Sequence, residues 1–252
     1  MTPEEKFVMD LLGESLGLEL EIVEIVTDQK TPDFSTMHAG KKYLLELKSS
    51  FESEDAVYAK KVAYKQDGIY CKQEVIQPTV KNSNNFSNAH KQLENRKGSE
   101  SADFCLYILN LTNTDGSFQE QTVFANLLGE ANILTDKGIY PCLYYHESDF
   151  YKRKSLIDGA IIINRGSTPI LVINDYSYNY ELFRASSFAK LFTAVFDPPE
   201  IERTSETISI RGNVNRKDRA ALRLYLEQKY NFEFAIEDKF INSYASAQLN
   251  AD

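Results

Sequence analysis

Hydrophobic and polar residues alternate with two different periods in the first part of the chain. Apolar side chains recur three and four positions apart over residues 3–16, which predicts an amphipathic helix that begins at Thr2 and Pro3. Residues 18–27 instead alternate apolar and acidic side chains, the pattern of a half-buried strand. The predicted fold therefore opens with a helix that is followed directly by a strand.

The same two periods predict the next elements. Residues 31–36 and 42–49 have strand patterns, and the turn residues at 38–41 fold these strands into an antiparallel pair. Residues 86–97 have a helical pattern, and the strongly apolar residues 102–111 predict a buried central strand. A helix, an antiparallel meander, a second helix and a further strand indicate a mixed α/β sheet that is covered by helices.

Patterns are weaker in the rest of the chain. Residues 51–85 are polar and are interpreted as an insertion, with a partial helix near residues 55–65 and a loop at residues 82–85. The remaining predicted elements are a weak helix at 118–136, a strand at 139–145, a polar connection at 151–154, a hairpin of strands at 159–164 and 169–174, a helix at 180–196, a strand at 207–211 and a helix from about 216 to 230.

Two units follow from this organisation. Residues 1–200 are predicted to form one domain, with its core in residues 2–111 and the insertion at about residues 51–85. Residues 201–252 form a C-terminal extension that begins after a proline-rich break and can pack on the same domain.

Composition limits the class of protein. The 252 residues are 42% hydrophobic and have neither a transmembrane run nor a secretory signal, so we expect a folded, cytoplasmic protein that does not enter a membrane. Cys71, Cys105 and Cys142 are too scattered for a disulfide framework or a structural zinc site.

The net charge of −9 is unevenly distributed. Residues 1–40 hold two basic residues against nine acidic ones, whereas residues 41–97 hold eleven basic residues against seven acidic ones. A local positive face can bind phosphates on an acidic protein, and a plain solvated surface is the alternative interpretation.

Three residues of the predicted meander carry candidate chemistry. Glu46 and Lys48 are two positions apart on one strand, so their side chains point to the same face, and the turn brings Asp33 back towards Glu46. Two carboxylates from neighbouring strands can bind a hard cation such as Mg²⁺, which activates water for phosphodiester hydrolysis. Lys48 would orient the attacking water or stabilise negative charge. A surface hairpin with an ordinary Glu–Lys pair is the structural alternative.

One further acid stands out in the first predicted helix. Glu4 falls in the middle of the apolar face that Phe7 and Val8 help to form. A charged side chain at this position is unusual for a simple surface helix, and fraying of the first turn is the structural alternative.

Pro32-Asp33 followed by Glu46-Leu47-Lys48 resembles the signature of the PD-(D/E)XK nuclease superfamily. The resemblance implies a restriction endonuclease-like αβββαβ core, a mixed sheet flanked by helices, with additional C-terminal strands and helices. The order of elements predicted for residues 2–111 agrees with that core, and the resemblance does not extend to residues 112–252.

The same resemblance implies a site. Asp33, Glu46 and Glu4 would hold Mg²⁺ or Mn²⁺, and Lys48 would assist the attacking water. Gln92 looks like the glutamine that the second helix offers in some members, although Arg96 stands where one branch of the superfamily has tyrosine.

The function implied is a metal-dependent endonuclease that acts on DNA, in restriction, in phage defence or in DNA processing. A homodimer or a partner subunit would fit such an enzyme. Two alternatives stay open: a catalytically inactive nuclease fold that binds nucleic acid or acts as a scaffold, and a nuclease directed at RNA.

Two features outside the core also suggest contacts with nucleic acid. Tyr176, Tyr178 and Tyr180 alternate along the chain and can stack on unpaired bases, although tyrosine is also common in strands. A group of basic side chains lies near the start of the last predicted helix, and an amphipathic helix packed on the body is the favoured explanation of this pattern; the group comprises Arg216, Lys217, Arg219 and Arg223.

Overall fold

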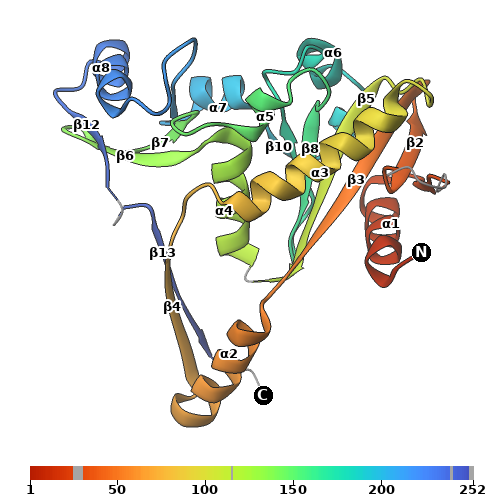
Figure 1. Cartoon of the computed structure of the whole chain (residues 1–252), viewed down its shortest axis with the longest axis horizontal. Helices are drawn as coiled ribbons and strands as arrows, with labels where there is room; N and C mark the ends of the chain where they lie inside the picture. Colours follow the sequence, from red (N-terminus) through yellow and green to blue (C-terminus); the bar gives the residue numbers. More distant parts are fainter. Residues whose placement is uncertain (25–30, 115, 239–240, 250–252) are drawn as a thin grey trace.

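The computed structural model describes residues 1–24, 31–114, 116–238 and 241–249. Its centre is a seven-stranded mixed sheet with helices on both faces (Figure 1). In their order across the sheet, the strands are β1 (Glu21–Ile22), β2 (Phe34–His38), β3 (Lys41–Phe51), β5 (Phe104–Asn113), β8 (Gly159–Ile163), β9 (Ile170–Ile173) and β10 (Ala194–Phe196).

Two smaller sheets join this centre. Four strands form one of them, in the order β11 (Ile208–Ser209), β7 (Gly138–Leu143), β6 (Ala131–Thr135) and β12 (Ala235–Glu237). The other pairs β4 (Ile69–Val75) with β13 (Ser243–Leu249). The helices are α1 (Pro3–Leu16), α2 (Glu54–Asp67), α3 (Val80–Lys97), α4 (Gly116–Leu128), α5 (Asp149–Lys152), α6 (Tyr180–Arg184), the short 3₁₀ helix η1 (Ala189–Leu191), α7 (Pro198–Thr204) and α8 (Arg219–Tyr230).

The two faces of the large sheet bury different apolar clusters. Leu44 of β3 faces the cluster under α3 and α4, whereas its neighbours Tyr43 and Leu45 face the cluster under α1 and α6. Because side chains alternate along a strand, Glu46 and Lys48 share the α3 face with Leu44. This alternation places the candidate chemistry between the sheet and α3.

The α/β class and the mixed sheet flanked by helices are confirmed. The first helix is capped by reciprocal hydrogen bonds between Thr2 and Glu5 and ends at Gly17 in the left-handed conformation (φ 67°). Strands β1, β2 and β3 form the predicted antiparallel meander, β5 is the buried central strand, and β8 and β9 form the predicted antiparallel hairpin.

Some predicted elements differ from the structure. The strand expected at residues 18–27 is limited to Glu21–Ile22 within the described residues, and positions 25–27 lie outside them. Residues 82–85 are helical rather than a loop, because Thr79 caps α3 and the buried Asn82 donates to Asn126. Residues 131–135 form β6 rather than the end of a helix, because they pair with both β7 and β12.

Three further expectations differ from the structure. The helix predicted for residues 180–196 is divided into α6, η1 and β10, because β10 pairs in parallel with β9. The expected insertion contains a strand, β4, that the sequence pattern did not predict. The last predicted helix begins at Arg219 rather than near Arg216.

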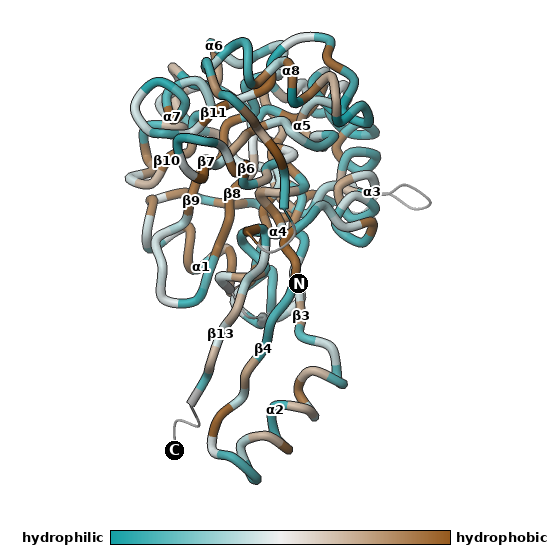
Figure 2. Tube along the Cα trace, turned by 90° about the vertical axis from the view of Figure 1, so that its left-hand side faces the viewer, coloured by the Kyte–Doolittle hydropathy of each residue, from teal (hydrophilic) through white to brown (hydrophobic). Residues whose placement is uncertain are grey.

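Segments α2, β4 and β13 form an arm that projects from the body (Figures 1 and 2). The C-terminal strand β13 thus pairs with the insertion, whereas α8, β11 and β12 join β6 and β7 over a third apolar cluster. Within the described residues, none of the helices has the length and apolar character needed to cross a membrane.

Candidate functional site

Asp33 is held at the point where the chain enters β2. The register pairs Phe34 with Leu45, so Asp33 falls beside Glu46 on the neighbouring strand. The Leu47 backbone N–H donates to Asp33 Oδ2 at 2.7 Å, and the Val23 N–H donates to the Asp33 carbonyl at 3.1 Å. The Leu47 N–H therefore fixes the carboxylate of Asp33, and the Val23 N–H fixes its backbone.

Glu46 is fully buried, and its two oxygens have different surroundings. Lys48 Nζ lies 2.5 Å from Oε1, whereas Oε2 is buried without a hydrogen-bond partner. Burial, and after it the negative charge of Asp33, raise the pKa of Glu46 to about 8, although the Lys48 ammonium opposes both effects. A second cation at Oε2 would therefore stabilise the ionised form.

Burial also raises the pKa of Asp33, while the Leu47 N–H and the Lys48 ammonium lower it. Two acids with raised pKa values thus share one cationic side chain. When both acids are ionised, one positive charge faces two negative charges in a buried site.

Gln92 connects α3 to this group. Its Oε1 accepts a hydrogen bond from Lys48 Nζ at 3.2 Å, and its Nε2 donates to the Thr31 carbonyl at 3.0 Å. The buried Ala89 and Leu93 on the same helix fix the side of α3 that faces the sheet. Gln92 therefore holds the Lys48 side chain next to the segment that leads into β2.

Glu4 lies elsewhere. The side of α1 that packs on the sheet is centred on Val8 and Leu12, and Phe7 is 42% exposed. Glu4 lines a cavity of about 500 Å³ at the ends of β5 and β8, together with Asn164. The structure therefore brings together Asp33, Glu46, Lys48 and Gln92 and places Glu4 in a separate cavity.

The structure adds two residues that the sequence did not single out. The Glu5 carboxylate contributes to the raised pKa of Asp33, and the Thr31 carbonyl anchors Gln92. Glu5 had a signal in the sequence, because it occupies the third position after a threonine N-cap and shares a helical side with Val8. Thr31 acts through its backbone, which no side-chain pattern indicates.

The fit of a divalent cation can be judged from the donor set. Within the residues that the structure describes, no group of three or more His, Cys, Asp or Glu side chains is arranged to hold a metal. Asp33 and Glu46 nevertheless supply the two hard oxygen donors that Mg²⁺ typically takes from a protein, with water and substrate phosphate as the remaining ligands. The unpartnered Glu46 Oε2 makes this site suitable for a cation.

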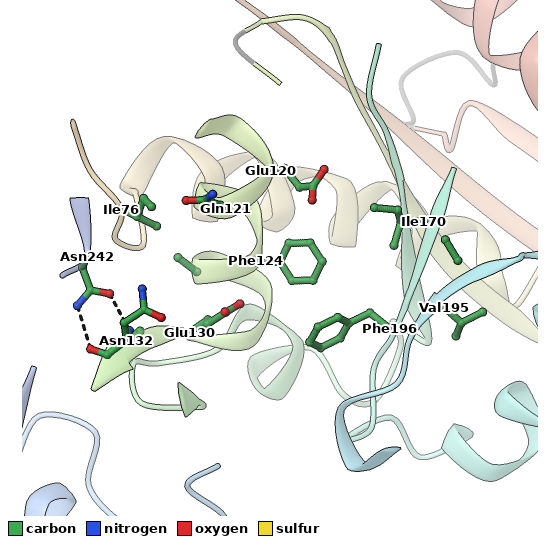
Figure 3. Close-up of a pocket in the computed structure, with 13 residues that line it drawn as sticks. Ile76, Glu120, Gln121, Phe124, Glu130, Asn132, Ile170, Val195, Phe196 and Asn242 are labelled. Carbon is green, nitrogen blue, oxygen red and sulfur yellow. Dashed lines mark hydrogen bonds between the residues drawn. The ribbon is translucent and has the colours of Figure 1, made fainter. Parts of the chain in front are cut away.

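A different cavity, of about 560 Å³, lies between α4, β6 and β10 (Figure 3). Its walls include Phe124 and Phe196, whose rings are 5.0 Å apart, and the Glu130 side chain also lines it. Burial raises the pKa of Glu130 to about 7. Gly129 fixes the backbone before it, since φ is +62° and a Cβ there would lie 2.3 Å from the His146 carbonyl oxygen.

No family model, curated protein or solved structure matches the chain. The geometry itself describes a cluster of two carboxylates, one ammonium and one amide from three elements. This cluster can bind a hard cation, hold a proton between two acids, and present a positive charge to an anion.

Proposed function

We propose that the chain is a divalent-metal-dependent endonuclease that hydrolyses phosphodiester bonds in DNA, built on a restriction endonuclease-like αβββαβ core. One observation carries this proposal: Asp33 and Glu46 converge from adjacent strands around Lys48, and a buried oxygen of Glu46 has no partner. The order of α1, the β1–β3 meander, α3 and β5 agrees with the proposed core.

Asp33 and Glu46 would hold the cation. Bound Mg²⁺ or Mn²⁺ would supply a Lewis acid that activates water and offsets charge on the phosphate. The Leu47 N–H donates to Asp33 Oδ2 and holds it in place. The second carboxylate oxygen of Asp33, Oδ1, is therefore the one that would bind the cation. Glu4 was expected to complete this shell, but it lies in the cavity with Asn164, so we leave it outside the proposed site.

Lys48 has two roles in this scheme. Its ammonium stabilises the ionised Glu46, and it offsets the negative charge that grows on the phosphate as water attacks and the bond to the leaving oxygen breaks. Gln92 is a positioning residue, because it contacts Lys48 rather than the reacting atoms.

The setting we propose is restriction or phage defence, or DNA processing. The net charge of −9 implies that contact with DNA is confined to local basic surfaces, or that a second copy or a partner subunit adds them. Inactive nucleic-acid binding and RNA cleavage are the two alternatives that the test below separates.

The test is cleavage of supercoiled plasmid, single-stranded DNA and RNA in Mg²⁺, Mn²⁺ or EDTA. Wild type is compared with Asp33→Asn and Lys48→Ala, and with the exposed control variants Asp10→Asn and Lys190→Ala. We expect metal-dependent DNA cleavage that is lost in the first pair of variants and kept in the controls.

Other outcomes have definite meanings. Cleavage of RNA alone would replace DNA as the substrate. Binding of nucleic acid in EDTA together with no cleavage in any metal would favour the inactive, scaffold-type protein. Cleavage that survives Asp33→Asn would remove this site from the proposal.

A further inference from the structure

A third pocket, of about 430 Å³, lies beside α5. Three tyrosines from two distant segments form its aromatic wall. The Tyr176 ring lies 4.8 Å from Tyr144 and 5.0 Å from Tyr151, and it is nearly perpendicular to both. Tyr144 is anchored beneath by a hydrogen bond from its hydroxyl to Asp175. The wall is therefore preformed, and Tyr151 is 46% exposed at its mouth.

Basic side chains surround the same pocket. Lys152 and Arg216 line it, and Lys154 Nζ lies 4.2 Å from the centre of the Tyr151 ring. The guanidinium of Arg216 donates to the carbonyls of Val214 and Ile210, so no carboxylate neutralises it through these bonds. Tyr176 and Arg216 thus line the same pocket. They belong to the tyrosine group near residue 176 and the basic group near residue 216, which are separate in the sequence.

A shallow cavity of about 610 Å³ continues this pocket along the surface. It shares Lys152, Arg216 and the acidic Glu147 with the pocket and adds Lys217 and Arg219, and the first turn of α3 forms its opposite side. The N-terminal end of a helix favours anions. Glu147 also lies here and pairs with Lys152 at 3.0 Å and with Lys217 at 3.6 Å, but both partners are substantially exposed and these pairs are weak.

We propose that this pocket and its basic extension form a second nucleotide site, in which an unpaired base packs against Tyr151 and Tyr176 and its phosphate lies near Lys152 and Arg216. Aromatic faces with adjacent cations are the chemistry by which proteins hold unpaired bases of any sequence. The basic rim disfavours a cationic ligand, which an aromatic wall alone would also accept. The choice of ligand rests on the proposed function.

Helix α3 relates the two sites. Its first turn borders the basic extension, and Gln92 on the same helix contacts Lys48 of the candidate cleavage site. The helix rise of about 1.5 Å per residue separates Thr79 from Gln92 by roughly 20 Å along the axis. One strand of nucleic acid can therefore span both sites, so the second site would hold the strand beyond the scissile phosphate.

The experiment measures the fluorescence anisotropy of a labelled single-stranded oligonucleotide in EDTA, so that binding is read without cleavage. Wild type is compared with Tyr151→Ala, Tyr151→Phe and Lys152→Ala, and with the control Tyr178→Ala, whose ring is 73% exposed and does not line the pocket. Fully paired duplex and a free mononucleotide are run as separate arms. Thermal melting verifies that each variant is folded.

We expect Tyr151→Ala to weaken binding of the single strand about 5- to 100-fold, and Tyr151→Phe and Tyr178→Ala to leave it within about twofold. Lys152→Ala should reduce the salt dependence of binding by about 0.7 in the logarithmic slope. Duplex binding should not respond to Tyr151→Ala. A mononucleotide that binds more tightly than the oligonucleotide would assign the pocket to a free nucleotide and overturn the strand-holding role.

Equal affinities of folded Tyr151→Ala and Tyr178→Ala for the oligonucleotide would overturn the proposal, as would the absence of any nucleotide binding by wild type. This test is independent of cleavage. Binding that depends on Tyr151 in a protein that cleaves nothing would uphold this site and reject the endonuclease, and cleavage without Tyr151-dependent binding would do the reverse.

Discussion

Glu46, which is fully buried, and Glu130, which is half-buried at the wall of a cavity, are two acids in different parts of the molecule. Burial raises the pKa of each, to about 8 for Glu46 and about 7 for Glu130. Glu46 has a second acid, Asp33, on one side and the Lys48 ammonium on the other. Glu130 faces a cavity with aromatic walls, and burial alone accounts for its shift (Figure 3).

The two acids differ in the charged groups that surround them. A raised pKa identifies a carboxyl group that is costly to ionise, but it does not say what relieves the cost. At Glu46 the neighbours form a donor set that a cation would complete. At Glu130 no charged neighbour contributes to the shift, so we assign it no part in the proposed reaction.

The largest expected effect is on the rate of cleavage, and it distinguishes Glu46 from Glu130. Glu46→Gln should reduce metal-dependent cleavage by about 10²- to 10³-fold, because it removes a charged donor from the site. Glu130→Gln, the matched control, should keep cleavage within about twofold of wild type. Steady-state cleavage of plasmid measures the rate of each variant. Equal losses in the two variants would show that Glu46 has no more part in the reaction than Glu130.

The next effect is on stability in the presence of metal. If the folded chain binds Mn²⁺, a concentration 100 times Kd should stabilise wild type by about 2.7 kcal/mol, or roughly 5–10 °C in Tm. Glu130→Gln should show the same rise, whereas Glu46→Gln and Asp33→Asn should not. Calorimetric melting in EDTA and in Mn²⁺ provides the measurement, and it does not depend on activity. A rise that persists in Asp33→Asn would place the ion elsewhere.

The pH dependence of stability should be smaller and common to both acids. Each folded-state pKa is raised above the ordinary value of 4.5, so the folded state binds more protons than the unfolded state in between. The contribution of each acid to stability is therefore full below pH 4.5 and is lost as pH rises through about 7 for Glu130 and about 8 for Glu46.

Substitution by glutamine makes this dependence measurable. Urea unfolding between pH 5 and pH 9 should give a shallower decline of stability with pH for both variants. The difference from wild type should end near pH 7 for Glu130→Gln and near pH 8 for Glu46→Gln. Wild-type stability that instead increased across this range would contradict both assignments.

The smallest effect concerns the neighbours of Glu46. Gln92→Ala removes the hydrogen bond to Lys48 and the one to the Thr31 carbonyl. We expect cleavage to fall by about tenfold or less, since the positioned ammonium remains paired with Glu46. The exposed substitution Lys91→Ala on the same helix is the control. A loss as large as that of Glu46→Gln would show that Gln92 acts on the reacting atoms directly.

The sequence predicted local structure well where one period dominated. Helix α1, the β1–β3 meander and the buried β5 follow from apolar spacing that each segment carries by itself. Asp33, Glu46 and Lys48 were also within reach, because strand alternation and one turn determine their relation. The predicted membership in a nuclease fold stays a prediction.

Longer-range contacts limited the rest. Residues 82–85 have loop-like composition, but the Asn82–Asn126 hydrogen bond holds them in a helix, and Asn126 comes from a distant element. The sequence predicts Glu4 from an apolar face that includes Phe7, but Phe7 is half-exposed, and Glu4 lines a cavity with Asn164 that the local pattern does not indicate. The cavity at Glu130 combines segments whose meeting no local pattern specifies.

The arm has a consequence for the local stability of the chain. Strand β4 pairs with β13, which is far from it in sequence, from Ile69↔Leu249 to Val75↔Ser243. Helix α2, which lies beside these strands, has no buried residue. A two-stranded ribbon with little apolar cover has low local stability, and its distant pairing must follow formation of the body. In hydrogen exchange, the amides of β4 and β13 should therefore exchange through local opening, while those of β5 exchange only when the whole domain unfolds.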